Sequence, residues 1–224
     1  MRPAPTAPVS LDSDAMVASA PEGVRPALPE DYGPLAEVLA RAFHDDPVTA
    51  WFYPDAERRM HHARRFFGIR LRQLAIHGLI FTNDERSGAA LWAPPGHWRE
   101  NLRQSLMQLP MLPVLLPRIV RATRAVREIE RHHPVQPHYY LSVVGTDPEK
   151  QGGGIGSALL LPVLRRCDEM QTAAYLESSK ESNLSFYARH GFAVSERIEL
   201  PEGPPLWLMW REPSGRRTGR PAGC

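Results

Sequence analysis

The sequence predicts a mixed α/β or α+β fold around a mixed sheet, and two observations lead to this class. Stretches with helical periodicity fill the first third of the chain. In the second half, β-branched and aromatic runs alternate with helical ones in the order β, α, β, α, β, β. Helices that alternate with strands in this way pack against a common sheet. Repeats of about 20 to 50 residues, which would indicate a solenoid, are not visible.

Composition indicates one soluble globular domain. The 224 residues are 42% apolar and 23% charged, and a core of this size stands without disulfides. Low-complexity ends predict disordered tails at 1–23 and 214–224, which leaves a folded domain at 24–213. Two cysteines, Cys167 and Cys224, fit a reducing cytosol. Because no apolar run approaches about 20 residues and no secretory signal is present, we expect a cytoplasmic protein without membrane contact.

The first half predicts two long helices and a hairpin. The first helix starts at 29–31 and ends near His44, and the second covers 57–78, because each carries an apolar stripe at 3 and 4 spacing. Residues 79–84 and 89–94, which flank the turn ERSG, predict a hairpin.

An insertion at 95–134 predicts several short helices and then a longer one. Pro110, Pro113 and Pro117 interrupt its helical pattern. Arginines at 118, 121, 124, 127 and 131 lie close to one face of the longer helix. A solvated face and an anion-binding patch both remain open, although the net charge of +2 is too mild to indicate nucleic-acid binding.

The remaining elements follow in quick succession. HYYLSVVGT (138–146) is the best strand signal in the chain, and a helix follows at about 154–170. A strand at 173–178, a short helix at 183–192 and two strands at 193–200 and 206–212 complete the fold.

The stretch QGGGIG (151–156) lies between a strand and a helix, where unpaired backbone N–H groups and the helix dipole favour an anion. A Walker-type loop needs Gly-Lys-Ser/Thr, but Gly156 precedes Ser157 and Ala158. A dinucleotide fingerprint needs glycine where Ser157 stands, so this interpretation is weak as well. By itself the stretch leaves a phosphate cradle and a mere structural turn about equally open.

Two ordered motifs decide between these alternatives. VVGTDPEKQGGGIGSALL (143–160) resembles the acetyl-CoA motif of the GNAT N-acetyltransferase superfamily, in which a strand leads to Gln/Arg-x-x-Gly-x-Gly/Ala at a helix start. ESNLSFYARHGF (181–192) is similar to the second motif of that family, an Asn followed four residues on by Tyr and then a Gly-Phe ending. The likeness is closest to puromycin N-acetyltransferase-like bacterial members, and it covers roughly 24–213, strongly from 139 onward.

The resemblance implies a fold and a cofactor. The fold would be a largely antiparallel central sheet flanked by helices, with the helical insertion at 95–134 before the central strand. Acetyl-CoA would bind as co-substrate, without a metal. The backbone of Val144, Gly145 and Thr146 would lie beside its pantetheine arm and stabilise the oxyanion. Its other expected contacts are Gln151, Gly152, Gly153, Gly154, Ile155, Gly156, Ser157 and Asn183. Because Gly154 and Gly156 occupy the fixed positions of the motif, Gly152 and Gly153 should tolerate alanine better.

The resemblance also implies catalytic residues. Tyr187 is the candidate general acid for the departing thiolate, although by itself it also fits a packed aromatic residue. Glu177 is the candidate general base or water relay, with simple capping or ion pairing as the alternative.

The acceptor is expected to be a primary amine of a small molecule, such as a puromycin-like antibiotic or a metabolite, bound by a monomer or homodimer. A protein N-acetyltransferase and a non-catalytic acyl-CoA-binding regulator remain alternatives. The loop after the first helix would bind a cationic amine through aromatic and acidic side chains, or it is only turn and core. The candidates for amine binding are Phe43, Asp45, Asp46, Trp51 and Tyr53, with His44, Phe52, Trp92 and Trp98 nearby.

Overall fold

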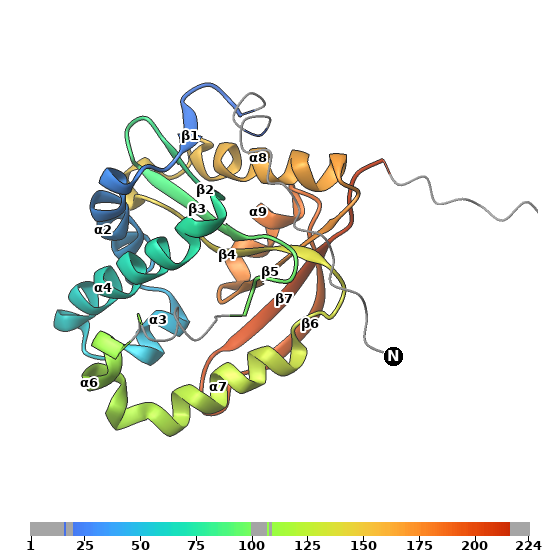
Figure 1. The fold of residues 1–224 in the computed structure, drawn as a ribbon. Helices are drawn as coiled ribbons and strands as arrows, with labels where there is room; N and C mark the ends of the chain where they lie inside the picture. Colours follow the sequence, from blue (N-terminus) through green and yellow to red (C-terminus); the bar gives the residue numbers. More distant parts are fainter. Residues whose placement is uncertain (1–15, 17–19, 100–106, 108, 216–224) are drawn as a thin grey trace, which may run out of the picture.

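The computed structural model describes residues 16, 20–99, 107 and 109–215, which we call the described residues. They contain a seven-stranded sheet in the order β1-β2-β3-β4-β5-β7-β6 (Figure 1). Neighbouring strands are antiparallel except for the parallel pair β4–β5. The predicted mixed, largely antiparallel sheet with flanking helices is therefore confirmed.

The strands are β1 (Val24–Pro26), β2 (Ile80–Asn83), β3 (Gly88–Ala93), β4 (His138–Thr146), β5 (Ala173–Ser178), β6 (Ala193–Glu199) and β7 (Pro205–Arg211). The α-helices are α2 (Tyr32–Ala42), α3 (Pro47–Phe52), α4 (Ala56–Leu74), α6 (Leu112–Leu115), α7 (Ile119–His132), α8 (Ile155–Glu169) and α9 (Leu184–Ala188). Short 3-10 turns accompany them: η1 (Pro29–Asp31), η2 (Ala75–His77), η3 (Leu109–Met111), η4 (Leu116–Arg118), η5 (Pro148–Lys150) and η6 (Glu181–Asn183).

The predicted hairpin, later strands and helices outside 95–134 are confirmed, and two short elements were not predicted. Part of the predicted helical insertion, at 100–106 and 108, lies outside the described residues, and its described part contains α6 and α7. The helix α3 forms because the Asp46 side chain accepts the Thr49 N–H at 2.9 Å and Pro47 takes the first helical position. The strand β1 has three residues and pairs only with β2 at the sheet edge. Met16 and Ala20, which fall inside the predicted N-terminal tail, pack against the core.

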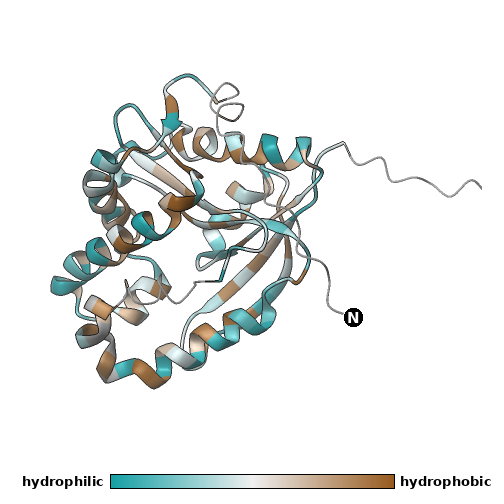
Figure 2. Cartoon of the chain, in the orientation of Figure 1, coloured by the Kyte–Doolittle hydropathy of each residue, from teal (hydrophilic) through white to brown (hydrophobic). Residues whose placement is uncertain are grey.

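Three apolar clusters place the helices on the two faces of the sheet. One face packs against α8 and α9 through residues such as Leu141, Leu176 and Leu160. The opposite face packs against α2 and α4 near β3, and against α7 near β5–β7. In Figure 1, α8 and α7 accordingly lie at opposite ends of the view with the sheet between them. Figure 2 shows hydrophobic residues on the strands and polar ones on much of the outer surface of α7.

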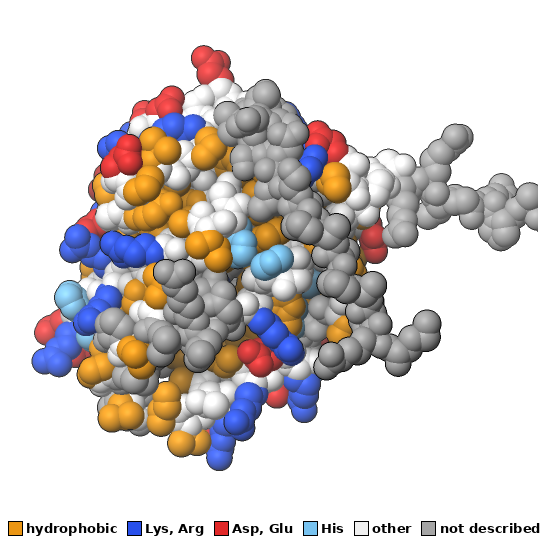
Figure 3. All heavy atoms as spheres, in the orientation of Figure 1, with side chains coloured by type: hydrophobic (Ala, Val, Ile, Leu, Met, Phe, Trp, Pro, Cys, Tyr) orange, Lys and Arg blue, Asp and Glu red, His pale blue; other side chains and the backbone are white. Residues whose placement is uncertain are grey.

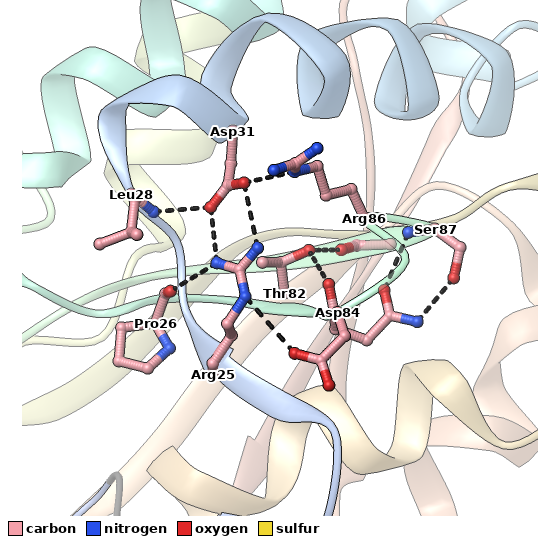
Figure 4. Close-up of polar contacts among 10 residues, drawn as sticks. Arg25, Pro26, Leu28, Asp31, Thr82, Asp84, Arg86 and Ser87 are labelled. Atoms are coloured by element: carbon pink, nitrogen blue, oxygen red, sulfur yellow. Dashed lines mark hydrogen bonds and ion pairs between the residues drawn. The ribbon is translucent and has the colours of Figure 1, made fainter.

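A buried carboxylate joins the start of α2 to the first three strands (Figure 4). Asp31, which is fully buried, accepts hydrogen bonds from Arg25 at 2.6 and 3.1 Å, from Arg86 Nε at 2.5 Å and from the Leu28 N–H at 2.8 Å. The Arg25 hydrogen bond is the largest cause that holds the pKa of Asp31 below its usual range. Since β1, the β2–β3 turn and α2 all meet here, Asp31 sets the direction in which α2 leaves the sheet edge.

The strands β4 and β5 pair over only part of their length. Their parallel register runs from His138 opposite Ala173 to Tyr140 opposite Tyr175 and ends there. The register between β3 and β4 shifts opposite Leu91 and Trp92, so that Ser142 is the extra residue of a bulge. Beyond this bulge, β4 keeps β3 as its partner. Its other edge pairs with no further strand of the described residues up to Thr146.

Candidate active site

A cleft of about 510 Å³ lies where β4 and β5 separate, and both faces of the sheet contribute to it. From the α8–α9 face come the glycine turn, Asn183, Phe186 and Tyr187; from the α2–α3 face come Ala42, Phe43 and Asp46. The end of β4 supplies Val144, Gly145 and Thr146. The structure thus brings together both halves of the predicted site, which are about 30 residues apart in the sequence.

Most residues predicted to bind the cofactor line this cleft. They are Val144, Gly145, Thr146, Gln151, Gly152, Gly154, Ile155, Gly156, Ser157 and Asn183, whereas Gly153 does not line it. Lys150, Lys180 and Arg189 also line the cleft and were not predicted. Cationic side chains beside a helix start are the chemistry that a diphosphate requires. Their only sequence signal was the proximity of Lys150 to the glycine stretch.

The glycine turn uses its glycines in a different way than predicted. Gly152 and Gly154 have φ of +85° and +80°, the left-handed region that favours glycine. Gly156 has no such φ, and a Cβ there would meet Phe186 at an ordinary 3.4 Å. The prediction that Gly152 tolerates alanine is therefore wrong, because its backbone conformation is strained for any L side chain. Gly153 has ordinary φ and space for a Cβ, as predicted.

Gly145 allows α2 to approach β4 closely. A Cβ at this position would lie 2.9 Å from Leu39 Cδ2 and 3.0 Å from Phe43 Cε2. A side chain at this position would therefore require Leu39 and Phe43 to shift. Arg41, at the end of α2, also binds Asp147 directly after β4. The wall of the cleft at Ala42 and Phe43 is consequently held against the end of β4.

Tyr187 is buried in the core cluster and its side chain lines the cleft. Burial, with a smaller contribution from Asp46, raises the pKa of its hydroxyl. A phenol with a raised pKa stays protonated at neutral pH, but the same shift makes it a weaker proton donor to a thiolate. The placement is compatible with the predicted acid role and with the alternative of a packed aromatic.

The residues predicted to bind the amine are distributed over three environments. Phe43 and Asp46 line the cleft, and the second Asp46 oxygen accepts a hydrogen bond from the Ser179 hydroxyl just after β5. Asp45 is exposed. Tyr53 is buried against His62, and burial raises the pKa of its hydroxyl to about 12. The structure brings only Phe43 and Asp46 of this set to the cleft.

Trp51 belongs to a contact between α3, α7 and the β6–β7 turn. Trp51 Nε1 and Arg121 Nη2 both donate to the Glu202 carbonyl oxygen at 2.6 Å, and the Arg121 guanidinium lies 4.4 Å from the centre of the Trp51 ring. These three residues, which we call the Trp51 clasp, join α3 to α7 and to the β6–β7 turn. Arg124 also approaches Glu202, at 3.9 Å, so part of the arginine face serves packing.

The rest of the arginine face meets solvent beside apolar side chains. Arg131 pairs with Glu128 on the same helix at 2.5 Å. Leu116, Val120 and Val126 are exposed between the arginines. On the face seen in Figure 3, Lys and Arg side chains are interspersed with acidic ones and with hydrophobic residues rather than gathered into one patch.

Glu177 does not line the cleft but lies against His133, the residue after α7. Its side chain is 9% exposed, and its Oε1 lies 3.4 Å from Nδ1 of His133, which is 1% exposed. That contact is not aligned as a hydrogen bond, so Oε1 has no hydrogen-bond partner among the described residues. The nearby Tyr175 hydroxyl is likewise buried without a partner, and its pKa is raised by burial and by Glu177. His133 was not predicted, because a histidine at a helix end carries no sequence signal.

The part of the chain that the structure describes holds no group of three His, Cys, Asp or Glu side chains that could bind a metal. None of its helices is both long and apolar enough to cross a membrane. Cys167 is buried, and burial raises the pKa of its thiol to about 12, so it remains an unreactive thiol. Cys224 lies outside the described residues.

Comparisons with known proteins agree with this geometry. The family model described as the acetyltransferase (GNAT) domain matches residues 123–209, which include β4, the glycine turn and α9. An uncharacterized N-acetyltransferase of Schizosaccharomyces pombe is 29% identical over 205 residues, covering 82% of this chain and 81% of that protein.

Solved structures share the fold. A crystal structure from Corynebacterium glutamicum, described as histone acetyltransferase HPA2 and related acetyltransferase, is 26% identical with a TM-score of 0.62 and covers 85% of this chain and 96% of its own. The PaiA N-acetyltransferase of Thermoplasma acidophilum, solved with coenzyme A, is 15% identical with a TM-score of 0.52. The match covers 84% of this chain and 97% of that protein. Together with the sheet topology, these matches show that the chain has the GNAT fold and indicate an N-acetyltransferase.

Proposed function

We propose that the chain transfers an acetyl group from acetyl-CoA to a primary amine of a small molecule, by direct attack in a ternary complex. The observation that carries this proposal is the cleft between the separated strands, lined by the glycine turn, Asn183 and Tyr187. Its dimensions suit an extended cofactor arm, and its lining combines unpaired backbone N–H groups with cations. The coenzyme A in the Thermoplasma relative supports the same use of this fold.

In this proposal the residues divide the chemistry between them. The helix start at Ile155–Ser157, with Lys150 and Arg189, holds the diphosphate, and the edge of β4 lies beside the pantetheine arm. Since β4 lacks a strand partner there, its backbone groups are available to the thioester carbonyl as negative charge develops on the oxygen. Tyr187 donates the proton that the departing thiolate takes up. Glu177 takes a proton from the amine, directly or through a water.

The Trp51 clasp supports a small acceptor rather than a peptide. It joins α3 to α7 and to the β6–β7 turn through two hydrogen bonds of 2.6 Å to one carbonyl oxygen. An extended peptide needs an open groove across this face, whereas a small amine needs only an entrance. Asp46 beside Phe43 at the cleft suits a cationic, partly apolar amine. The closer likeness to puromycin N-acetyltransferases stays a prediction, and puromycin is one candidate acceptor.

A thiol-release assay with acetyl-CoA tests the proposal over a panel of amines. The panel contains puromycin, other aminonucleosides, polyamines, arylalkylamines and short peptides with free N-termini. Turnover of a small amine with kcat/KM at least about tenfold above every peptide supports the proposal. Preferred turnover of peptides would replace the small acceptor by a protein one. Binding of acetyl-CoA without turnover of any amine would indicate a non-catalytic acyl-CoA-binding protein.

A further inference from the structure

A buried chain of hydrogen-bonding groups ends at Glu177. The Gln136 carbonyl oxygen lies 2.7 Å from His138 Nδ1, and His138 Nε2 lies 3.0 Å from His133 Nε2. His133 Nδ1 then faces Glu177 Oε1 at 3.4 Å. The three side chains come from β4, from the residue after α7 and from β5, so tertiary folding alone assembles them.

The donors and acceptors of this chain follow from its fixed end. A carbonyl oxygen only accepts, so His138 Nδ1 carries a hydrogen. Burial is the main cause that lowers the pKa of His138, and the neutral ring then has a bare Nε2 that accepts. The contact of 3.0 Å between the two rings needs one hydrogen, which must come from His133 Nε2. A neutral His133 therefore presents a bare Nδ1 to Glu177.

Two bare acceptors cannot face each other without repulsion. A charged carboxylate and the lone pair of His133 Nδ1 repel in this buried environment, and a single proton between them turns the contact into a charge-assisted hydrogen bond. The two atoms lie 3.4 Å apart, and Oε1 has no hydrogen-bond partner among the described residues, so a proton between them would meet an unused acceptor. The pair is thus arranged to accept one proton and to hold it jointly.

We propose that His133 and Glu177 form a proton-sharing pair that receives the proton of the acceptor amine, with His138 fixing the tautomer of His133. This inference rests on the proposed function. His133, whose side chain is 1% exposed against 9% for Glu177, acts through Glu177 and is a positioning residue. Trp98, which stacks on the His133 ring at 3.6 Å, covers the ring and orients it.

The proton balance of the step is complete for an amine that attacks in its neutral form, after an ammonium has lost its extra proton to solvent. The amine nitrogen bonds to the thioester carbon while one N–H proton passes through a water to the Glu177 carboxylate, whose buried Oε1 shares it with His133 Nδ1. The C–S bond then breaks, its electron pair leaves on sulfur, and the thiolate takes a proton from Tyr187. Return of one proton from the pair to Tyr187 through water restores both groups.

Other charged and titratable groups surround the pair, and they enter any pH profile. On α7, His132 contacts Glu128 at 3.2 Å and Glu196 of β6 at 3.0 Å. Tyr140 of β4 and Tyr175 of β5 pack against the His133 ring, and Arg99 lies over Trp98 at 4.7 Å. His132 does not contact Glu177 in any interaction among the described residues, which makes it a matched control.

The variant His133→Asn separates proton sharing from structure. Its amide can donate to Glu177 from the position of Nδ1 but cannot accept a proton there. We expect acetyl-CoA affinity within about threefold of the wild type by calorimetry. The ascending limb of kcat/KM against pH should move to lower pH by about one unit, and the maximum should fall about tenfold, because a weaker base remains. His132→Asn should leave the position of the ascending limb and the maximum of kcat/KM unchanged.

The tautomers themselves are measured by NMR on the full chain with ¹⁵N-labelled histidine. In the wild type, the neutral rings should carry hydrogen on His138 Nδ1 and His133 Nε2. In Glu177→Gln, His133 should stay neutral to a lower pH than in the wild type. A hydrogen on His133 Nδ1 in its neutral form, an unmoved titration in Glu177→Gln, or an unmoved pH profile in His133→Asn would overturn proton sharing. Failure of the wild type to bind acetyl-CoA would instead overturn the proposed function.

Discussion

At the scale of single residues, Asp31 contributes to the site from a distance. Its buried carboxylate holds Arg25, Arg86 and the Leu28 N–H, and through them it sets the start of α2. The other end of α2 supplies Ala42 and Phe43 to the cleft. Removing a buried partner of this kind leaves two arginines without their counter-charge.

Asp31→Ala should lower the free energy of unfolding by about 3–5 kcal/mol, measured by urea denaturation at pH 7. Asp84→Ala is the matched control, because Asp84 is exposed and lies 3.6 Å from Arg25. This variant should lower the free energy of unfolding by only about 0–1 kcal/mol. The folded pKa of Asp31 is lowered, so its contribution is present above the unfolded pKa of about 4 and is lost as pH falls toward the folded value. Equal effects of the two variants would contradict this role.

Tyr187 is the residue whose predicted role is easiest to separate from packing. Tyr187→Phe keeps the buried ring and removes only the proton donor, so kcat at pH 7 should fall about 10²-fold with acetyl-CoA affinity unchanged. Steady-state kinetics on the amine found in the screen, with calorimetry, measure the two quantities. Tyr139→Phe, another buried tyrosine of the same core cluster, should leave kcat unaltered. A loss of cofactor affinity in Tyr187→Phe would make the tyrosine a binding residue.

At the scale of elements, the glycine turn depends on backbone conformation at two positions. Gly152→Ala and Gly154→Ala place an L residue at φ of +85° and +80°, which costs about 1 kcal/mol and shifts the N–H groups of the turn. Both variants should weaken acetyl-CoA binding about tenfold in calorimetry, while Gly153→Ala should not. Gly96→Ala has the same φ of +80° with open space, so it should share the stability cost and bind normally. Unchanged acetyl-CoA affinity in Gly154→Ala would contradict the proposal that the glycine turn binds the cofactor.

The Trp51 clasp is the second feature at this scale, and it connects α3, α7 and the β6–β7 turn. Arg121→Ala removes the ring contact and one of the two hydrogen bonds to the Glu202 carbonyl. The contact between α3, α7 and the β6–β7 turn should loosen. We therefore expect KM for the small amine to rise about tenfold while KM for acetyl-CoA stays constant. Arg127→Ala, on the same helix, is the control. Changes in KM for both substrates would show that the clasp supports the whole fold rather than the binding of the amine.

Much of this organisation could be predicted from the sequence, because it depends on local patterns. Helical apolar stripes and β-branched runs predicted the long helices and strands. Two spaced motifs predicted a shared site for Gly154 and Tyr187, which line one cleft in the structure. The rest depends on contacts distant in sequence. His133 approaches Glu177 only because α7 crosses β5, and the left-handed φ of Gly152 follows from the path of the turn. The short helix α3 depends on Asp46 as its N-cap, which looked like a turn residue.

At the scale of the whole molecule, the parallel pair β4–β5 is the central feature. Its hydrogen bonds end at Tyr140 and Tyr175, and the bulge at Ser142 turns β4 away. The gap joins the α8–α9 face, which carries the glycine turn, to the face with α2, α3 and α7. In the proposed mechanism, a cofactor and an acceptor approach one carbonyl carbon from opposite sides of this gap, as direct transfer requires.

Calorimetric titration of the full chain with acetyl-CoA tests this central claim most directly. We predict one site per chain with a micromolar Kd in the wild type, and no measurable binding in Gly154→Glu, whose carboxylate would stand where the diphosphate is expected. Thermal unfolding of the variant, with Gly96→Glu as control, shows that the chain remains folded. The absence of binding in the wild type, or unchanged binding in a folded Gly154→Glu, would contradict the account.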